Sequence, residues 1–349
     1  MRRRGTRTRG AASLLAALTL LAISSALAAA LADAARVEVV LARHRRIMAA
    51  GLATADACLA RVLSSVPVGW DFASTLAGVD GIAGTADDGI VVAPAGCSVS
   101  ARAAPGASDP PRVRFTLSAT TPGGQRTADA VGGRATDPGA PALIWLADAA
   151  ALGSIGGTLT LDGTDPLAPT SPLWATVAAP GDPTALDAWV AAQGVRIGVG
   201  PATTAPIGVA APPLAALAGR VTAAGPLAPG TALVTAGTPP TALAFVAGDL
   251  VVDVPRSGVG LLFVDGVLDV RADLAYRGVV VASRGIRVAA GAQLDLGGTL
   301  WLGSPASAGS PLVVDGTVRL RRDVAGVAAA DSLLRLPRRA VLLGMRDVG

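Results

Sequence analysis

AASLLAALTLLAISSALAAALA, residues 11–32, is the most distinctive segment of this 349-residue chain. Its 22 residues carry no charge, and a helix of that length can cross a bilayer core of roughly 30 Å. The next stretch, DAARVEVVLARHRRIMAAGLATADACLARVLSS (33–65), contains no proline and mixes apolar and charged residues at helical spacing. The first proline is Pro67. The sequence therefore predicts one helix over residues 11–65, about 80 Å long at about 1.5 Å per residue, half in lipid and half outside it.

A short basic leader precedes this helix. Residues 1–10 contain five arginines, no acidic residue and a final glycine, Gly10. A leader of this kind, followed by a membrane helix that runs into an amphipathic one, resembles a type IV pilin-like precursor, most closely the PilX-type minor pilus assembly proteins. The resemblance implies that a prepilin peptidase cuts after Gly10 on the cytoplasmic side and leaves Ala11 as the new N-terminus. The chain departs from major pilins at Ala11, where they have Phe, and at Leu15, where they have Glu; minor members at filament tips tolerate the loss of that Glu.

Two other interpretations of the N-terminus remain open. A Sec signal peptide would be cut near the A-x-A sites around Ala26 to Ala30, and a plain anchor would not be cut at all. The uncharged run is longer than the usual signal core of about 7–15 residues, and the helical pattern continues beyond it. These two features favour the pilin-like interpretation.

Composition limits what the rest of the chain can be. The hydrophobic content is 51% and the mean hydropathy is +0.54, but 43 glycines and 25 prolines break up the apolar runs. This favours short strands and turns over further membrane spans. Loss of the five leader arginines takes the formal net charge from +4 to −1, so the mature chain is not expected to bind nucleic acid. The basic leader should stay cytoplasmic and direct the C-terminal region outward, although Arg43, Arg45 and Arg46 lie on the far side of the span.

The chain has two cysteines, Cys58 and Cys97. An even number in a chain predicted to be exported suggests a disulfide that ties the helix end to the next domain. Two buried free thiols are the alternative.

A loop rich in glycine and aspartate, GVDGIAGTADDGIVV, follows the helix. Asp80, Asp87 and Asp88 lie among glycines, as in loops that bind calcium through carboxylates and backbone carbonyls. The EF-hand spacing is absent. A solvated turn before a strand is the favoured interpretation, and a calcium site is the alternative; no other cofactor is expected.

Strand patterns dominate the region after the helix, 66–166. Residues 97–133 alternate with period two between turn signals, and they resemble a short pilin-type antiparallel sheet packed on the long helix. Residues 137–166 add two apolar runs, and Asp162 and Asp165 are predicted to cap turns. Residues 167–243 are predicted to be linker and surface segment with one helix, for which Asp182 is the N-cap, Pro183 the first residue and Gly194 the end.

A repeat begins in the segment 244–325. Gly260, Gly278 and Gly298 open successive units of nearly equal length, and each unit contains two short aliphatic strands. Stacked units of roughly 20 residues are typical of a β-solenoid. They also resemble the glycine-punctuated C-terminal repeat of PilX-type proteins and, superficially, bactofilin-like repeats. An antiparallel meander is the alternative. Residues 326–349 are predicted to form a basic C-terminal tail.

Groups for catalysis are scarce. The one histidine, His44, lies among arginines on the predicted helix, and the chain has no lysine, so neither a Ser-His or Cys-His pair nor a histidine metal site is expected. Asp265, Asp269 and Asp273 suggest paired carboxylates, but they fall at strand ends and turns. The chain is not expected to be an enzyme.

The sequence thus predicts an α+β, mostly β protein with a leader (1–10), a transmembrane and amphipathic helix (11–65), a small antiparallel sheet region and a β-solenoid-like repeat. The resemblance implies a structural minor pilin-like component in the inner membrane, with its C-terminal region periplasmic or extracellular. Its partners would be the prepilin peptidase and other pilin subunits, which the helix contacts. The alternative function is an exported or membrane-anchored β-solenoid adhesin or binding protein that is not part of a pilus.

Overall fold

The computed structural model describes most of the chain, from the N-terminal helix to the last strand. The described ranges are 7–104, 111–121, 124–138, 140–148, 153–165, 175–180, 183–192, 196–197, 210–304 and 310–348.

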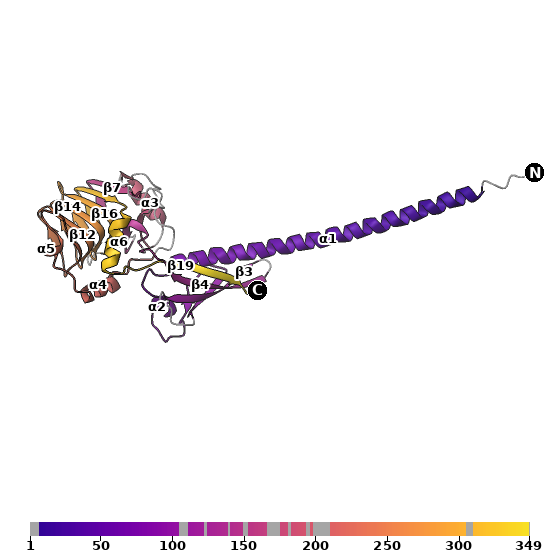
Figure 1. Cartoon of the computed structure of the whole chain (residues 1–349), viewed down its shortest axis with the longest axis horizontal. Helices are drawn as coiled ribbons and strands as arrows, with labels where there is room; N and C mark the ends of the chain where they lie inside the picture. Colours follow the sequence, from indigo (N-terminus) through magenta and orange to yellow (C-terminus); the bar gives the residue numbers. More distant parts are fainter. Residues whose placement is uncertain are drawn as a thin grey trace, which may run out of the picture.

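One long helix, α1 (Arg7–Ser65), begins the chain and projects far beyond the rest of the molecule (Figure 1). Its 59 residues correspond to about 90 Å at about 1.5 Å per residue. Alanine and leucine, both strong helix formers, are its commonest residues, and no proline interrupts it. The predicted continuous apolar helix is confirmed.

An antiparallel sheet packs against the C-terminal part of α1. Its strand order is β1-β2-β3-β4-β19, and β3 shows the expected alternation, with Val113, Phe115 and Leu117 fully buried against the helix. A short helix, α2 (Ala73–Leu76), precedes it. The strands are β1 (Ile90–Val91), β2 (Cys97–Ala103), β3 (Arg112–Thr121), β4 (Gly124–Arg134) and β19 (Ala340–Asp347). We call α1, α2 and this sheet the helix–sheet module.

The other strands form two parallel sheets. We call these two sheets and the helices α3 to α6 the parallel stack. The longer sheet has the order β10-β12-β14-β16-β18-β7-β9, with β5 paired to β16 and β8 paired to β5. Its strands are β10 (Thr241–Val246), β12 (Arg256–Val264), β14 (Leu274–Ala282), β16 (Gln293–Leu302), β18 (Thr317–Arg321), β7 (Thr158–Asp162), β9 (Arg196–Ile197), β5 (Ala142–Leu146) and β8 (Ala175–Ala178).

The shorter sheet has the order β11-β13-β15-β17-β6. Its strands are β11 (Leu250–Val252), β13 (Leu268–Val270), β15 (Ile286–Val288), β17 (Leu312–Val314) and β6 (Ser154–Ile155). From β10 to β18 the chain alternates between the two sheets, so each strand pairs in parallel with the next but one. The antiparallel meander considered for this region is therefore wrong.

The glycine repeat sets the register of the longer sheet. Gly260 pairs with Gly278, and Gly278 pairs with Gly298. A Cβ at Gly278 would overlap the carbonyl oxygen of Gly260, and its φ is +129°, a conformation that L side chains rarely adopt. The repeat spacing thus has a physical cause: each unit stacks its glycine on the glycine of the unit before.

Two buried clusters hold the parallel stack together. One contains aliphatic side chains from both sheets, such as Leu262, Val270 and Val288. The second cluster lies where α4 and α6 cover the longer sheet and includes Phe263, Trp145 and Trp301. The ring centroids of Trp145 and Trp301 are 4.9 Å apart. The helices are α3 (Pro183–Ala192), α4 (Leu214–Ala223), α5 (Pro229–Ala232) and α6 (Val324–Leu333).

Three predicted segment boundaries need correction. The region 66–166 is divided, because only its part up to β4 belongs to the helix–sheet module, whereas β5, β6 and β7 belong to the parallel stack. The segment 167–243 contains strands β8 and β9 and helices α3 to α5, because the Pro- and Ala-rich composition obscured their apolar spacing. Helix α3 begins at Pro183 as predicted, while Asp182 and Gly194 lie outside the described residues. The expected basic tail, 326–349, instead continues α6 and forms β19.

The parallel stack is an insertion in the helix–sheet module. The chain leaves the antiparallel sheet at the end of β4 and returns to it as β19, which pairs with β4. The entry and exit points are adjacent, since the Ala135 N–H donates to the Arg339 carbonyl at 3.0 Å. A C-terminal segment therefore completes the N-terminal sheet.

Candidate membrane and assembly surface

The N-terminal half of α1 is exposed on all sides. Its large apolar side chains are 50–68% exposed, whereas monomeric soluble proteins rarely expose large contiguous apolar patches. Among the described residues, α1 is the one helix long and apolar enough to cross a membrane. The exposed side chains are Leu14, Leu15, Leu18, Leu20, Leu21, Ile23, Leu27, Leu31, Val37, Val39, Val40 and Leu41.

The C-terminal half of α1 buries a single face. Gly51, Ala55, Cys58, Leu59 and Val62 are buried, and their spacing places them on one stripe of a helix. The stripe packs against the inner side chains of β2 to β4. The same helix thus offers apolar surface in its first half and is fixed to the sheet in its second half.

A disulfide joins this half of the helix to the sheet. It connects Cys58 of α1 with Cys97 of β2, whose Cα atoms are 6.5 Å apart. The two cysteines are 39 residues apart in sequence, so the bond closes a loop that includes α2 and β1.

Contact between α1 and the sheet begins near Met48, whose sulfur contacts the Arg126 guanidinium of β4. One turn further on, a Cβ at Gly51 would lie 3.1 Å from the Cγ of Arg126. The absence of a side chain at Gly51 therefore leaves room for the aliphatic part of the Arg126 side chain to lie across the helix.

A buried arginine of β4 joins the segment that follows α1 to the segment that precedes β19. The Arg134 side chain is 5% exposed, donates hydrogen bonds to the carbonyls of Pro67 (2.8 Å), Arg338 (3.0 Å) and Asp71, and stacks on Phe72 with its Cζ 4.1 Å from the ring centroid. Burial lowers the pKa of Arg134 to about 10, and Asp71 acts in the opposite direction.

The segment after α1 is also held by the returning chain. Gly69 and Arg338 exchange backbone hydrogen bonds of 3.0 and 2.8 Å. The Trp70 indole N–H donates to the Arg335 carbonyl at 2.6 Å, and Arg220 of α4 stacks on the Trp70 ring at 4.2 Å. No local pattern in the sequence predicts this junction, because its partners come from distant parts of the chain.

The carboxylates of Asp80, Asp87 and Asp88 accept hydrogen bonds from their own loop. Asp87 Oδ2 accepts from the N–H groups of Val79 (2.8 Å) and Asp80 (3.0 Å), and Asp88 Oδ2 accepts from Gly84 (2.8 Å). A hydrogen bond from the Thr85 hydroxyl, followed by those backbone donors, lowers the pKa of Asp87. Within the described ranges, no group of three or more His, Cys, Asp or Glu residues could hold a metal ion.

Two of the three aspartates of the repeat connect successive units, and the third forms a local ion pair. Asp265 Oδ1 accepts from the Ser283 hydroxyl at 2.9 Å, and Asp273 Oδ1 accepts from the Gln293 N–H at 3.1 Å. Asp269 pairs with Arg271 at 2.7 Å. The three carboxylates suggested as a catalytic set are thus held by different neighbours.

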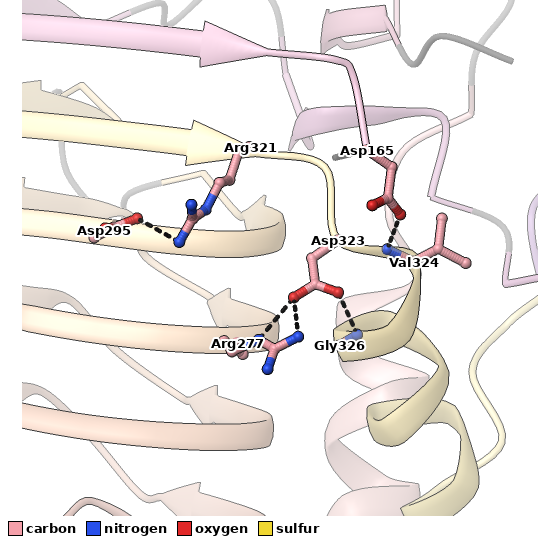
Figure 2. Close-up of polar contacts among 7 residues, drawn as sticks. All are labelled: Asp165, Arg277, Asp295, Arg321, Asp323, Val324 and Gly326. Carbon is pink, nitrogen blue, oxygen red and sulfur yellow. Dashed lines mark hydrogen bonds and ion pairs between the residues drawn. The ribbon is translucent and has the colours of Figure 1, made fainter. Parts of the chain in front are cut away.

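Helix α6 is anchored by carboxylates at its start (Figure 2). Asp323, its N-cap, accepts from the Gly326 N–H at 2.8 Å and forms an ion pair with Arg277 of β14 at 2.7 Å. Asp165 accepts from the Val324 N–H at 2.9 Å. Nearby, Arg321 and Asp295 form a longer ion pair of 3.9 Å. These contacts were not foreseen, although an Asp shortly before a glycine and a run of alanines is a recognisable helix start.

The other predicted site residues are placed as follows. Asp162 caps its turn, since its Oδ1 accepts from the Thr164 N–H at 3.0 Å. His44 lies exposed on α1. Gly10 and Ala11 belong to α1, and their surroundings lie outside the described residues.

Comparisons with known proteins add little. No protein-family model matches the chain, and no curated protein matches it. A solved structure with weak similarity is the competence-associated pilin ComZ from Thermus thermophilus, with 11% identity, a TM-score of 0.24 and coverage of 74% of this chain and 84% of that one. A score this low does not establish a shared fold.

The geometry defines a coarse class. The chain is an α+β protein, mostly β, with a long apolar N-terminal helix, one antiparallel sheet and two parallel sheets among the described residues. The exposed apolar half of that helix suits membrane anchoring.

Proposed function

We propose that this protein is a minor pilin-like subunit of a type IV pilus or a related filament. Before assembly, α1 anchors it in the inner membrane, and the helix–sheet module and the parallel stack lie on the periplasmic side. During assembly, the exposed half of α1 leaves the lipid and packs against the helices of other pilin subunits.

A single observation supports the proposal above the others: one uninterrupted helix is apolar and exposed in its first half and fixed to an antiparallel sheet in its second. Burying one exposed leucine gains about 1.5–3 kcal/mol, so this surface is stable only in lipid or against other helices. A cleaved signal peptide has no need to continue rigidly into the folded domain.

We further propose that the parallel stack is a β-solenoid that decorates the filament or caps its tip. Support comes from the parallel pairing of successive units of similar length and from the core that the two sheets share. The proposal includes no catalytic role, cofactor or nucleic-acid partner. The Asp80, Asp87 and Asp88 loop is assigned a structural role.

The N-terminus of the mature protein tests this function. We expect mass spectrometry of the protein from sheared filaments to find a chain that begins at Ala11. Gly10→Arg should prevent cleavage, because a side chain before the scissile bond would collide in the peptidase site. The uncut protein should accumulate in the inner membrane and be absent from filaments, since leader charges buried without partners among packed helices cost several kcal/mol each.

Gly10→Ala is the matched control and should be processed at least in part, because its side chain is small. A mature start near Ala28 to Ala35, or normal processing and export of Gly10→Arg, would contradict the proposal. The protein would then be an exported β-solenoid adhesin or binding protein outside any pilus, a function that the extended parallel stack also suits.

A further inference from the structure

A ring of basic side chains encircles α1 at Arg43, His44, Arg45 and Arg46. All four residues are exposed, and successive helical positions are turned by about 100°, so together they cover the whole circumference. In the described part of the chain, none of the three arginines takes part in an ion pair. Arg36, by contrast, pairs with Asp33 at 3.6 Å. The ring is therefore three uncompensated positive charges on a helix with no protein around it.

The ring lies at the C-terminal end of the exposed apolar part of α1. The exposed apolar side chains run from Leu14 to Leu41, about 40 Å along the axis. The uncharged run ends at Ala32, and the charged residues Asp33, Arg36 and Glu38 lie in the last part of this segment. A bilayer of about 40–45 Å includes polar headgroup regions, which can hold such charges. The ring comes directly after Leu41. Contact with the antiparallel sheet begins only at Met48. The arginines thus occupy a bare stretch between the lipid-length segment and the folded region.

We propose that Arg43, Arg45 and Arg46 bind the phosphate groups of anionic phospholipids at the outer face of the inner membrane. This inference rests on the proposed anchoring of α1. A guanidinium forms paired hydrogen bonds with phosphate oxygens, and basic residues near an anionic membrane are attracted within about one Debye length. Because α1 is continuous from the ring to Ser65, such binding fixes the depth of the helix and the height of the helix–sheet module above the membrane.

A second copy of the chain is the competing partner, through its Asp80, Asp87 and Asp88 loop. The lipid is favoured for two reasons. The loop carboxylates already accept hydrogen bonds from their own backbone, and the ring lies at the boundary set by the apolar length. The test separates the two partners.

The experiment uses the full chain reconstituted in phosphatidylcholine vesicles with trace spin-labelled phosphatidylglycerol or spin-labelled phosphatidylcholine. Electron paramagnetic resonance measures the lipid immobilised at the protein surface. We expect a several-fold preference for phosphatidylglycerol that high salt weakens. The variant Arg43→Gln/Arg45→Gln/Arg46→Gln should lose at least half of that preference. The control Arg287→Gln/Arg319→Gln/Arg335→Gln, which removes three exposed arginines of the parallel stack and the segment that follows α6, should keep it, and all variants retain the leader arginines.

Each contrary result has a distinct meaning. Absence of immobilised lipid would show that α1 is not in the bilayer and would overturn the proposed function together with this inference. Immobilised lipid with no headgroup preference, or with a preference that the ring variant keeps, would overturn the inference alone. A ring variant that keeps its lipid preference but self-associates less in detergent, measured by light scattering, would assign the ring to a second copy.

Discussion

The helix–sheet module and the parallel stack are both β structures with buried aliphatic cores, yet they are built in opposite ways. In the module, β2, β3 and β4 are antiparallel neighbours in sequence, and the last strand, β19, arrives from the far end of the chain. In the stack, each strand from β10 to β16 pairs in parallel with the next strand but one along the chain. The first and last parts of the chain therefore belong to one folding unit, and the stack is inserted between them.

The largest expected effect comes from removing the strand that closes the module. Deletion of residues 340–349 removes β19, which has seven paired positions on β4. We expect a loss on the order of 5 kcal/mol in the stability of the module, at roughly 1 kcal/mol or less per hydrogen bond. Replacing residues 138–337 with a short Gly/Ser linker should harm the module less, because Ala135 and Arg339 are already hydrogen-bonded.

Thermal unfolding followed by circular dichroism would compare the two variants. A module that unfolds more readily without the stack than without β19 would contradict the insertion.

The second effect is confined to the parallel stack. Gly278→Ala places a Cβ against the Gly260 carbonyl at a φ of +129°. Backbone strain alone typically costs about 1–3 kcal/mol, and because of the added overlap we expect a larger decrease in the free energy of unfolding. Gly248→Ala is the matched control, with a φ of +102° and open space around it. Urea unfolding should show the larger loss for Gly278→Ala, while the accessibility of the module to proteases stays unchanged. Equal losses would mean that the stacked glycines Gly260, Gly278 and Gly298, the glycine column, do not set the stacking distance.

A third, smaller effect belongs to the module alone. Cys58→Ser/Cys97→Ser should lower its stability by about 2–4 kcal/mol, as expected for a disulfide that closes a loop of moderate length. The stack contains no cysteine, so its unfolding should not change. Thiol labelling of the denatured, unreduced exported protein should find no free thiol, and alkylation of both cysteines would show that the bond is absent.

The smallest effect concerns the ion pair that joins β19 to β4. Arg346 and Asp129 lie 3.1 Å apart, and hydrogen bonds from Arg346 and then Thr116 lower the pKa of Asp129. A carboxyl whose folded pKa is below its unfolded value stabilises the protein above the unfolded value. That stability is lost as pH falls below about 4.

We therefore expect the module to lose less than about 1 kcal/mol from this exposed pair between about pH 5 and pH 3, measured by its melting temperature. In Asp129→Asn this part of the pH dependence should be absent. An unchanged acid dependence in that variant would show that other carboxylates are responsible.

Local patterns predicted local structure well. The uncharged run and the absence of proline before Pro67 predicted α1, and the alternation in residues 97–133 predicted the antiparallel strands. Pro183 marked the start of α3. The spacing of Gly260, Gly278 and Gly298 predicted the unit that repeats, although not the strand direction. Each of these depends on neighbours within one element or one turn, and the order of residues contains that information.

The order of residues is enough to predict a helix of membrane length, a region of alternating strands and a repeated strand unit. The contacts between these parts follow from the folded structure. The basic segment 326–349 forms most of α6 and β19, because α6 packs against the glycine column and β19 pairs with β4, both of which lie far away in sequence. Arg134 is buried because carbonyls from residues 67, 71 and 338 converge on it. Such convergence depends on packing between distant segments, and no local pattern of residues encodes it.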